Sequence, residues 1–129
     1  MCGRLLADLG ADVVQVEPIA GSTARHAPPV ADDGVSLYWE TYAAGKRGVS
    51  VDLTDEASVA QIRALAHVAD IVVASWPRVQ LEELGLDPAS VRLDNPGAVY
   101  TIISAFGWDG PKAEYADADL VVWAAGGPL

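Results

Sequence analysis

The stretch LLADLGADVVQVEP, from Leu5 to Pro18, decides the fold of this chain. Its first residues place leucines at helical spacing, and Gly10 then follows as a residue that ends a helix in the left-handed conformation at little cost. The valine-rich run after Gly10 is typical of a strand. A helix that leads through a glycine into a strand is the second half of a βαβ unit, so we expect the first strand of that unit to precede Met1.

The rest of the sequence continues this alternation of helix and strand. Strands are predicted where β-branched and other apolar residues run together, at 11–16, 48–53, 70–76 and 98–105. Helices are predicted at 3–9, 54–68, 81–84, 88–93 and 117–126, with Thr54 and Asp87 as N-caps. The segment 19–45 is expected to be irregular, apart from a short helix around Trp39. This order predicts an α/β fold with an open parallel sheet and flanking helices.

A sizeable hydrophobic core is expected, because the chain has 129 residues and 51% of them are apolar. In the first helix and the strands, the residues predicted to line the core are Leu5, Val14, Val16, Ile71, Val73 and Ile102. In the helix at 54–68, the residues predicted to be buried are Val59, Ile62, Leu65, Ala66 and Val68.

Charge and cysteine content exclude several classes of function. The net charge is −10, because 8 Lys and Arg stand against 18 Asp and Glu, and this disfavours nucleic acid as a partner. Cys2 is the single cysteine, so no internal disulfide can form. No apolar run reaches the roughly 18 residues of a membrane span, and no export signal is recognisable, so we expect a cytoplasmic protein with no membrane partner.

The motif Gly45-Lys46-Arg47-Gly48 is the most distinctive charged feature of this acidic sequence. Two adjacent cations between glycines suit a phosphate or a carboxylate, with the guanidinium of Arg47 as a two-point donor. A solvated turn is the alternative. Arg25, at the end of GSTAR, is a second candidate anion ligand, for which a surface arginine without a ligand is the alternative.

Other residues allow a ligand role and a structural role alike. Glu17 ends a predicted strand, at the position where an acid holds a ribose hydroxyl in dinucleotide-binding domains. The glycine-rich turn of that motif is absent from this sequence. The alternative is that Glu17 caps a nearby helix or forms an ion pair with a cationic side chain. Trp76 and Trp108 follow predicted strands and would either stack on a planar ligand or pack at the rim of the core. Cys and His lack the spacing of metal ligands, so no metal site is predicted.

The order of the segments resembles the amino-terminal part of the class III CoA-transferase family. The resemblance covers nearly the whole chain and rests on LLADLGADVVQVEP, GSTAR, GKRGVSVDL, ADIVVASW, LEELGLDPASVRLDNPGAVYTIISAFGWDGP and DADLVVWAAGG, in family order. The family includes formyl-CoA and carnitine CoA-transferases and the α-methylacyl-CoA racemases. It implies that residues 1–129 are part of a large, CoA-binding, Rossmann-like domain whose first strand and C-terminal parts are missing here.

The resemblance also implies a reaction. Transferases of the family move CoA from an acyl-CoA to a carboxylic acid, and an aspartate attacks the thioester to pass through a mixed anhydride and an aspartyl-CoA intermediate. That aspartate lies beyond the motif matched by DLVVWAAGG, so we expect no catalytic residue in this chain and no activity from it alone. The full-length protein is expected to be an interlocked homodimer.

Carried over residue by residue, the resemblance and the charged motifs predict contacts to CoA. The predicted CoA-binding residues are Pro18, Arg25, Lys46, Arg47, Ser75, Trp76 and Arg78. The chain departs from the family where Pro77, Arg78 and Val79 replace Arg-Pro-Gly. Ala118 replaces the histidine of the racemases, which argues against racemase activity.

Two other hypotheses stay open at this point. The chain is alternatively a non-catalytic CoA-binding or assembly subunit of a split or degenerate family member, which acts with a partner chain. It is alternatively a nicotinamide-binding Rossmann fragment from another class, for which Glu17 is the supporting residue.

Overall fold

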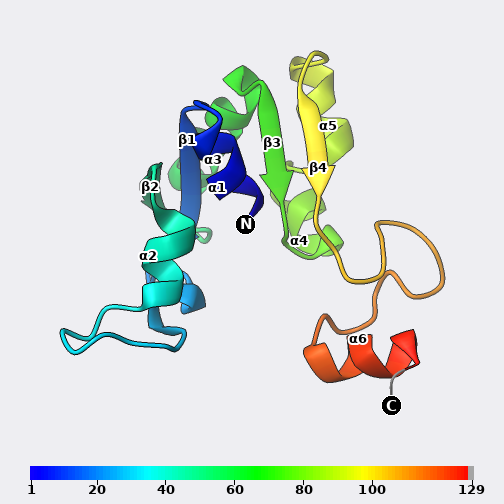
Figure 1. The fold of residues 1–129 in the computed structure, drawn as a ribbon. Coiled ribbons are helices and arrows are strands. Elements are labelled where there is room, and N and C mark those ends of the chain that lie inside the picture. The colour runs from blue at the N-terminus through cyan, green and yellow to red at the C-terminus, as the bar shows by residue number, and fades with distance from the viewer. Residues whose placement is uncertain (128–129) are drawn as a thin grey trace. The chain divides into compact units, whose positions relative to one another are not determined.

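The computed structural model of the chain describes residues 1–127 and is drawn in Figure 1. It divides into two compact units, Met1–Leu65 and Ala66–Leu129. Each unit contains one pair of parallel strands, so the α/β class with parallel strands and flanking helices is confirmed. The two units are described separately.

The first unit follows the predicted order closely. Its elements are α1 (Cys2–Asp8), β1 (Val13–Pro18), the 3-10 helix η1 (Thr23–His26), α2 (Leu37–Ala43), β2 (Lys46–Val51) and α3 (Glu56–Val68), whose last turn belongs to the second unit. Gly10 follows α1 with φ of 96°, the left-handed conformation for which glycine is suited. The helix, the glycine turn and the strand predicted from LLADLGADVVQVEP are therefore confirmed.

The parallel pair of β1 and β2 has two chemically different faces. Side chains alternate between the faces along each strand, and the register sets Val13 opposite Lys46 and Pro18 opposite Val51. One face, which we call the polar face, carries Val13, Gln15, Glu17, Lys46, Gly48 and Ser50. The other, the apolar face, carries Val14, Val16, Pro18, Arg47, Val49 and Val51.

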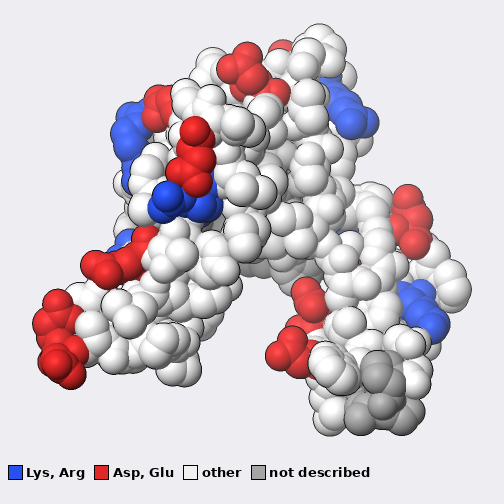
Figure 2. Space-filling view, in the orientation of Figure 1, with Lys and Arg blue, Asp and Glu red and all other residues white. Residues whose placement is uncertain are grey.

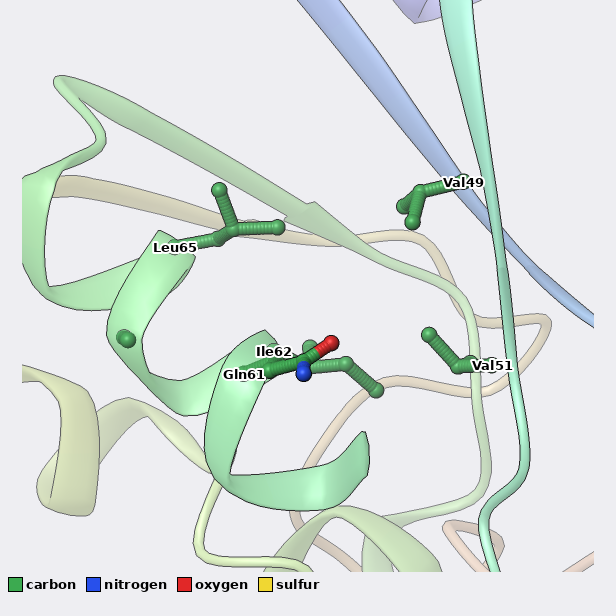
Figure 3. Close-up of a pocket in the computed structure, with 6 residues that line it drawn as sticks. Val49, Val51, Gln61, Ile62 and Leu65 are labelled. Carbon is green, nitrogen blue, oxygen red and sulfur yellow. The ribbon is translucent and has the colours of Figure 1, made fainter. Parts of the chain in front are cut away.

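The apolar face is covered by α3. Val51 of β2 is buried together with Val59 and Ile62 of α3, as predicted for the helix. The contact is incomplete, because an open apolar hollow of about 340 Å³ lies between the two elements (Figure 3). It is lined by Val49, Val51, Gln61, Ile62, Ala64 and Leu65.

The second unit repeats the pattern of strand, helix and parallel strand. Its elements are β3 (Ile71–Ala74), α4 (Arg78–Glu83), α5 (Pro88–Asp94), β4 (Val99–Ile102) and α6 (Asp119–Gly126). β3 and β4 are parallel, with Ile71 opposite Val99. Asp87 caps α5 as predicted, because its carboxylate accepts hydrogen bonds from the backbone N–H groups of Ala89 and Ser90. The core of this unit consists of Ala66, Leu81, Leu86, Val91 and Ala98.

Several predicted boundaries differ from the structure. β2 begins at Lys46 rather than at residue 48, so the two cations lie inside the strand and not in a preceding turn. The residue that caps α3 is Asp55 rather than Thr54, because the carboxylate of Asp55 accepts a hydrogen bond from the backbone N–H of Ser58. α4 begins earlier than predicted, at Arg78, and α6 begins later, at Asp119. Local sequence signals place the ends of an element less reliably than the element itself.

The predicted core is only partly buried. Leu5, Ile71, Val73 and Leu65 are exposed, and Val68 at the end of α3 is 79% exposed. These side chains have the apolar character of a core but no layer covering them among the residues described. None of the helices within residues 1–127 is both long and apolar enough to cross a membrane.

Candidate functional site

Glu17, at the carboxyl end of β1, forms a two-point ion pair with Arg25 of η1. Nε of Arg25 donates to Oε2 of Glu17 at 2.8 Å, and Nη2 donates to Oε1 at 3.0 Å. The backbone N–H of Ser22 donates to the same Oε2 at 2.9 Å. Glu17 is only 3% exposed, and the hydrogen bonds from Arg25 are the main cause that holds the pKa of this carboxyl below its usual value.

The guanidinium of Arg25 also lies over the ring of Trp39, a residue of α2. The distance from its Cζ to the ring centroid is 4.2 Å, within the range of a cation–π contact. Gly21 leaves the room for this arrangement, because a Cβ built there would lie 2.9 Å from Cδ of Arg25. Arg25 is therefore held on one side by a carboxylate and on the other by an aromatic face.

Lys46 extends along the polar face toward the same carboxyl end. Its Nζ donates to Oε1 of Gln15 at 2.9 Å, and its stem lies against Gly3 of α1, where a Cβ would be 3.3 Å from Cε of Lys46. Burial is the main cause that lowers the pKa of Lys46 below its ordinary value, and the neighbouring Arg4 lowers the pKa further. Within residues 1–127, no carboxylate forms an ion pair with this ammonium group.

Arg47 lies on the opposite face from Lys46. Its guanidinium makes two hydrogen bonds to the carboxylate of Asp12, at 2.9 and 2.6 Å, and both side chains are about 70% exposed. Because adjacent side chains in a strand point to opposite faces, Lys46 and Arg47 do not converge on one group. The two cations of the motif Gly45-Lys46-Arg47-Gly48 therefore point to different faces of the strand pair, and the binding of an anion by either of them stays a prediction.

Pro18, the remaining predicted site residue of the first unit, ends β1 next to Glu17 and is exposed. It lies at the carboxyl end of the strand pair, the edge at which open parallel sheets bind ligands. The first unit thus brings Pro18, Glu17 and Arg25 together at this edge, with Lys46 reaching toward it from the start of β2.

The second unit places Ser75, Trp76 and Arg78 directly after β3. Ser75 is exposed and Trp76 half-buried. Arg78 donates to Glu82 at 2.7 Å and to Asp109 at 2.9 Å. Its guanidinium also faces the ring of Trp108 at 5.3 Å. Arg78 therefore connects the start of α4 to the segment that follows β4, and its charge is compensated within the unit.

An open hollow of about 510 Å³ lies beside Arg78 in the same unit. Its lining consists of Arg78, Glu82, Asp87, Pro88, Ala89, Arg92, Tyr100, Ile102 and Trp108. The hydroxyl of Tyr100 donates to the carbonyl of Leu86. Burial is the main cause that raises the pKa of Tyr100 to about 12, so this residue is a neutral donor at physiological pH.

Several of the arginines lie next to acidic side chains. Figure 2 shows several blue side chains bordered by red ones, in keeping with the ion pairs of Arg4, Arg25, Arg47 and Arg78. Within residues 1–127 no three Cys, His, Asp or Glu side chains form a group suited to a metal ion. The expectation of no metal cofactor stays a prediction.

Sequence reasoning did not single out Gln15, Trp39 or Asp12, which contact the candidate cations. A signal existed for Gln15, since alternation along a strand puts it on the same face as Glu17, two residues later. No local signal places Trp39 on Arg25 or Asp12 on Arg47, because these contacts depend on how α2 and β2 return to β1.

Comparison with known proteins identifies the class of the molecule. The model of CoA-transferase family III matches residues 1–129, the whole chain. The chain therefore belongs to CoA-transferase family III, and the resemblance of its motifs to that family is confirmed.

Relatives with known names or structures agree with this assignment. The chain is 37% identical to a probable fatty acyl-CoA transferase of Mycobacterium tuberculosis, Rv3272, over 98% of this chain and 33% of the relative. It is 38% identical to succinate–glutarate CoA-transferase of Agrobacterium fabrum, over 97% and 33%. A CAIB/BAIF family protein from Brucella suis superposes with a TM-score of 0.85 at 33% identity, over 97% of this chain and 34% of that structure. The chain spans about a third of the length of these relatives.

Proposed function

We propose that this chain is a CoA-binding part of an enzyme that transfers CoA between carboxylic acids. The observation that carries the proposal is the match to CoA-transferase family III along the entire chain. By name, one of the two relatives is a probable fatty acyl-CoA transferase and the other a succinate–glutarate CoA-transferase. The proposed substrates of this protein are accordingly an acyl-CoA and a carboxylic acid. A cytoplasmic homodimer with interlocked subunits is part of this proposal.

Lys46 is the residue of the first unit best suited to an anionic group of CoA. Arg25 and Arg47 are each neutralised by a carboxylate at hydrogen-bonding distance, whereas the Lys46 ammonium bonds to the neutral amide of Gln15. A half-buried cation without a close counter-ion gains most from a phosphate or pyrophosphate. Pro18, at the carboxyl end of the same strand pair but on the apolar face, is proposed as a separate contact.

In the second unit the proposed contacts are Ser75, Trp76 and Arg78. The half-buried Trp76 is suited to stack on adenine or to cover pantetheine, and the exposed hydroxyl of Ser75 to donate a hydrogen bond. Arg78 is proposed to contact CoA while it keeps its ion pair with Asp109 and its contact with the ring of Trp108.

The covalent step is proposed to lie outside this chain. By the resemblance, the nucleophilic aspartate lies beyond the motif matched by 119–127, so the chain contributes CoA binding and not the nucleophile. A nicotinamide site is the less favoured function, because Glu17, the residue that would hold the ribose, is already occupied by Arg25. A non-catalytic subunit of a split enzyme is compatible with the same CoA site.

The test is calorimetric titration of CoA into the full 129-residue chain, with NAD and pantetheine as comparison ligands. We expect CoA to bind and pantetheine to bind more weakly, because pantetheine lacks the phosphates. NAD is expected not to bind. Incubation with acyl-CoA donors and carboxylates, followed by mass spectrometry, is expected to show no turnover. Binding of NAD in preference to CoA would overturn the proposal, and turnover would overturn its assignment of the covalent step.

A further inference from the structure

A polar cluster at the end of β1 has no role in the proposed contacts with CoA. It consists of Glu17, Ser22, Arg25 and Trp39, and we call it the clasp. Its members come from β1, from η1 with its N-cap Ser22, and from α2. The buried carboxylate of Glu17 therefore connects the end of β1 to η1 directly, and to α2 through Arg25.

We propose that Glu17 is a positioning residue, which holds Arg25 over Trp39 and thereby keeps the segment 19–45 in the conformation in which Lys46 receives CoA. The inference rests on the proposed function for its effect on CoA. Arg25, predicted from the sequence as an anion ligand, is by this proposal a structural partner of Glu17 and does not touch CoA.

The hydrogen bonds of Glu17 explain why Arg25 is not free to bind a ligand. The carboxylate accepts from Nε and Nη2 of Arg25 and from the N–H of Ser22. Transfer of Arg25 to a phosphate would leave a carboxylate that is 3% exposed without its counter-ion, and a buried charge without a partner is strongly destabilising. Arg25 thus stabilises the site through Glu17.

The clasp lies close to Lys46 on the polar face. A Cβ at Gly48, two residues after Lys46 in β2, would be 3.7 Å from Oε1 of Glu17. Arg25 is the main cause of the lowered pKa of Glu17, and the attraction of Lys46 is a smaller one. A displacement of Glu17 therefore changes the electrostatic surroundings of Lys46 directly, without any contact between Arg25 and a ligand.

A double-mutant cycle on CoA affinity separates positioning from direct contact. The variants are Glu17→Gln, Arg25→Gln and the double variant, each titrated with CoA. We expect each single change to weaken CoA binding about tenfold. The double variant should bind CoA as well as the single variant with the lower affinity, because both changes break the same ion pair. Arg25→Lys, which keeps the charge but lacks the planar fork, is expected to lie between wild type and Arg25→Gln. Additive losses would show that Arg25 contacts CoA by itself and would overturn the proposal.

Hydrogen exchange without ligand tests the clasp independently of CoA. We expect amides in 19–45 to exchange about tenfold faster in Glu17→Gln and Arg25→Gln, which corresponds to about 1.4 kcal/mol. Gly21→Ala is expected to have the same effect, because its Cβ would meet Arg25, whereas Gly34→Ala is the matched control. Both glycines have positive φ, 79° and 87°, but a Cβ at Gly34 meets nothing within 4 Å.

The outcomes distinguish the two proposals. If the wild-type chain does not bind CoA, the proposed function fails, and hydrogen exchange alone decides whether the clasp holds the segment. If CoA binds but exchange in 19–45 is the same in wild type and Glu17→Gln, the clasp proposal is overturned and the proposed function stands.

Discussion

Nζ of Lys46 lies 2.9 Å from Oε1 of Gln15, so the ammonium group hydrogen-bonds to a neutral amide inside the strand pair. Burial and the neighbouring Arg4 lower the pKa of Lys46, which means that the folded protein disfavours the charge it carries. A side chain such as Lys46, whose charged form is disfavoured by its surroundings in the folded protein, is a candidate for ligand binding.

Lys46→Met is expected to weaken CoA binding about ten- to a hundredfold, since a hydrogen bond to a charged group contributes about 1.5–3 kcal/mol. The free energy of unfolding should stay within about 0.5 kcal/mol of wild type or rise, because the change removes a half-buried charge. Calorimetry with CoA and urea unfolding measure the two quantities. A parallel loss of affinity and stability would show that Lys46 has only a structural role.

Arg47→Met provides the matched comparison one residue further along β2 and on the opposite face. It removes an ion pair with Asp12 in which both side chains are about 70% exposed, so we expect little change in the free energy of unfolding. CoA affinity should fall far less than in Lys46→Met. Equal losses of affinity in the two variants would contradict the assignment of the ligand to the polar face.

The ion pair of Glu17 and Arg25 predicts a dependence of stability on pH. The pKa of Glu17 is lowered in the folded protein, chiefly by Arg25, relative to an ordinary value of 4.5. Its stabilising contribution is therefore complete above about pH 4.5 and is lost as the pH falls through the lower, folded-state pKa. Comparing thermal unfolding of wild type and Glu17→Gln across this range tests the linkage. The difference between them should shrink toward acid pH, and a constant difference would disprove it.

Arg78→Gln is expected to loosen the segment that follows β4. The change removes the ion pairs to Glu82 and Asp109 and the contact with the ring of Trp108. Because these groups are partly exposed, the loss of stability should be small. Trp108 fluorescence, taken as the difference from a Trp108→Phe variant, should shift. Glu82→Gln keeps the other two contacts and should leave that emission unchanged, and an equal shift in both variants would refute the role of Arg78.

Asp87→Ala is expected to destabilise the second unit by about 1–2 kcal/mol through loss of the cap of α5. The buried carboxylate accepts from the N–H groups of Ala89 and Ser90 and from the hydroxyl of Ser90. Asp87→Asn keeps a capping oxygen and should recover most of the loss. Chemical unfolding compares the variants, and equal stability of Asp87→Ala and wild type would show that Pro88 alone starts the helix.

The sequence by itself determined the elements and their class. Helical spacing before Gly10, the valine-rich run after it and the proline after Asp87 are local signals, because each depends on the conformational preferences of a few neighbouring residues. The order of helices and strands then implied parallel pairing, which β1–β2 and β3–β4 confirm. The family followed from whole motifs rather than from any one residue.

Tertiary structure alone decided which charges remain for a ligand. Lys46 and Arg47 form one motif in the sequence, but β2 begins at Lys46, and the alternation along the strand separates the two side chains. Asp12 and Gln15 bond to Arg47 and Lys46, which are distant in the sequence, and Glu17 bonds to Arg25 of the following 3-10 helix. An ion pair is a property of distance in space, and burial sets its strength, so neither follows from the local pattern that predicts a helix or a strand.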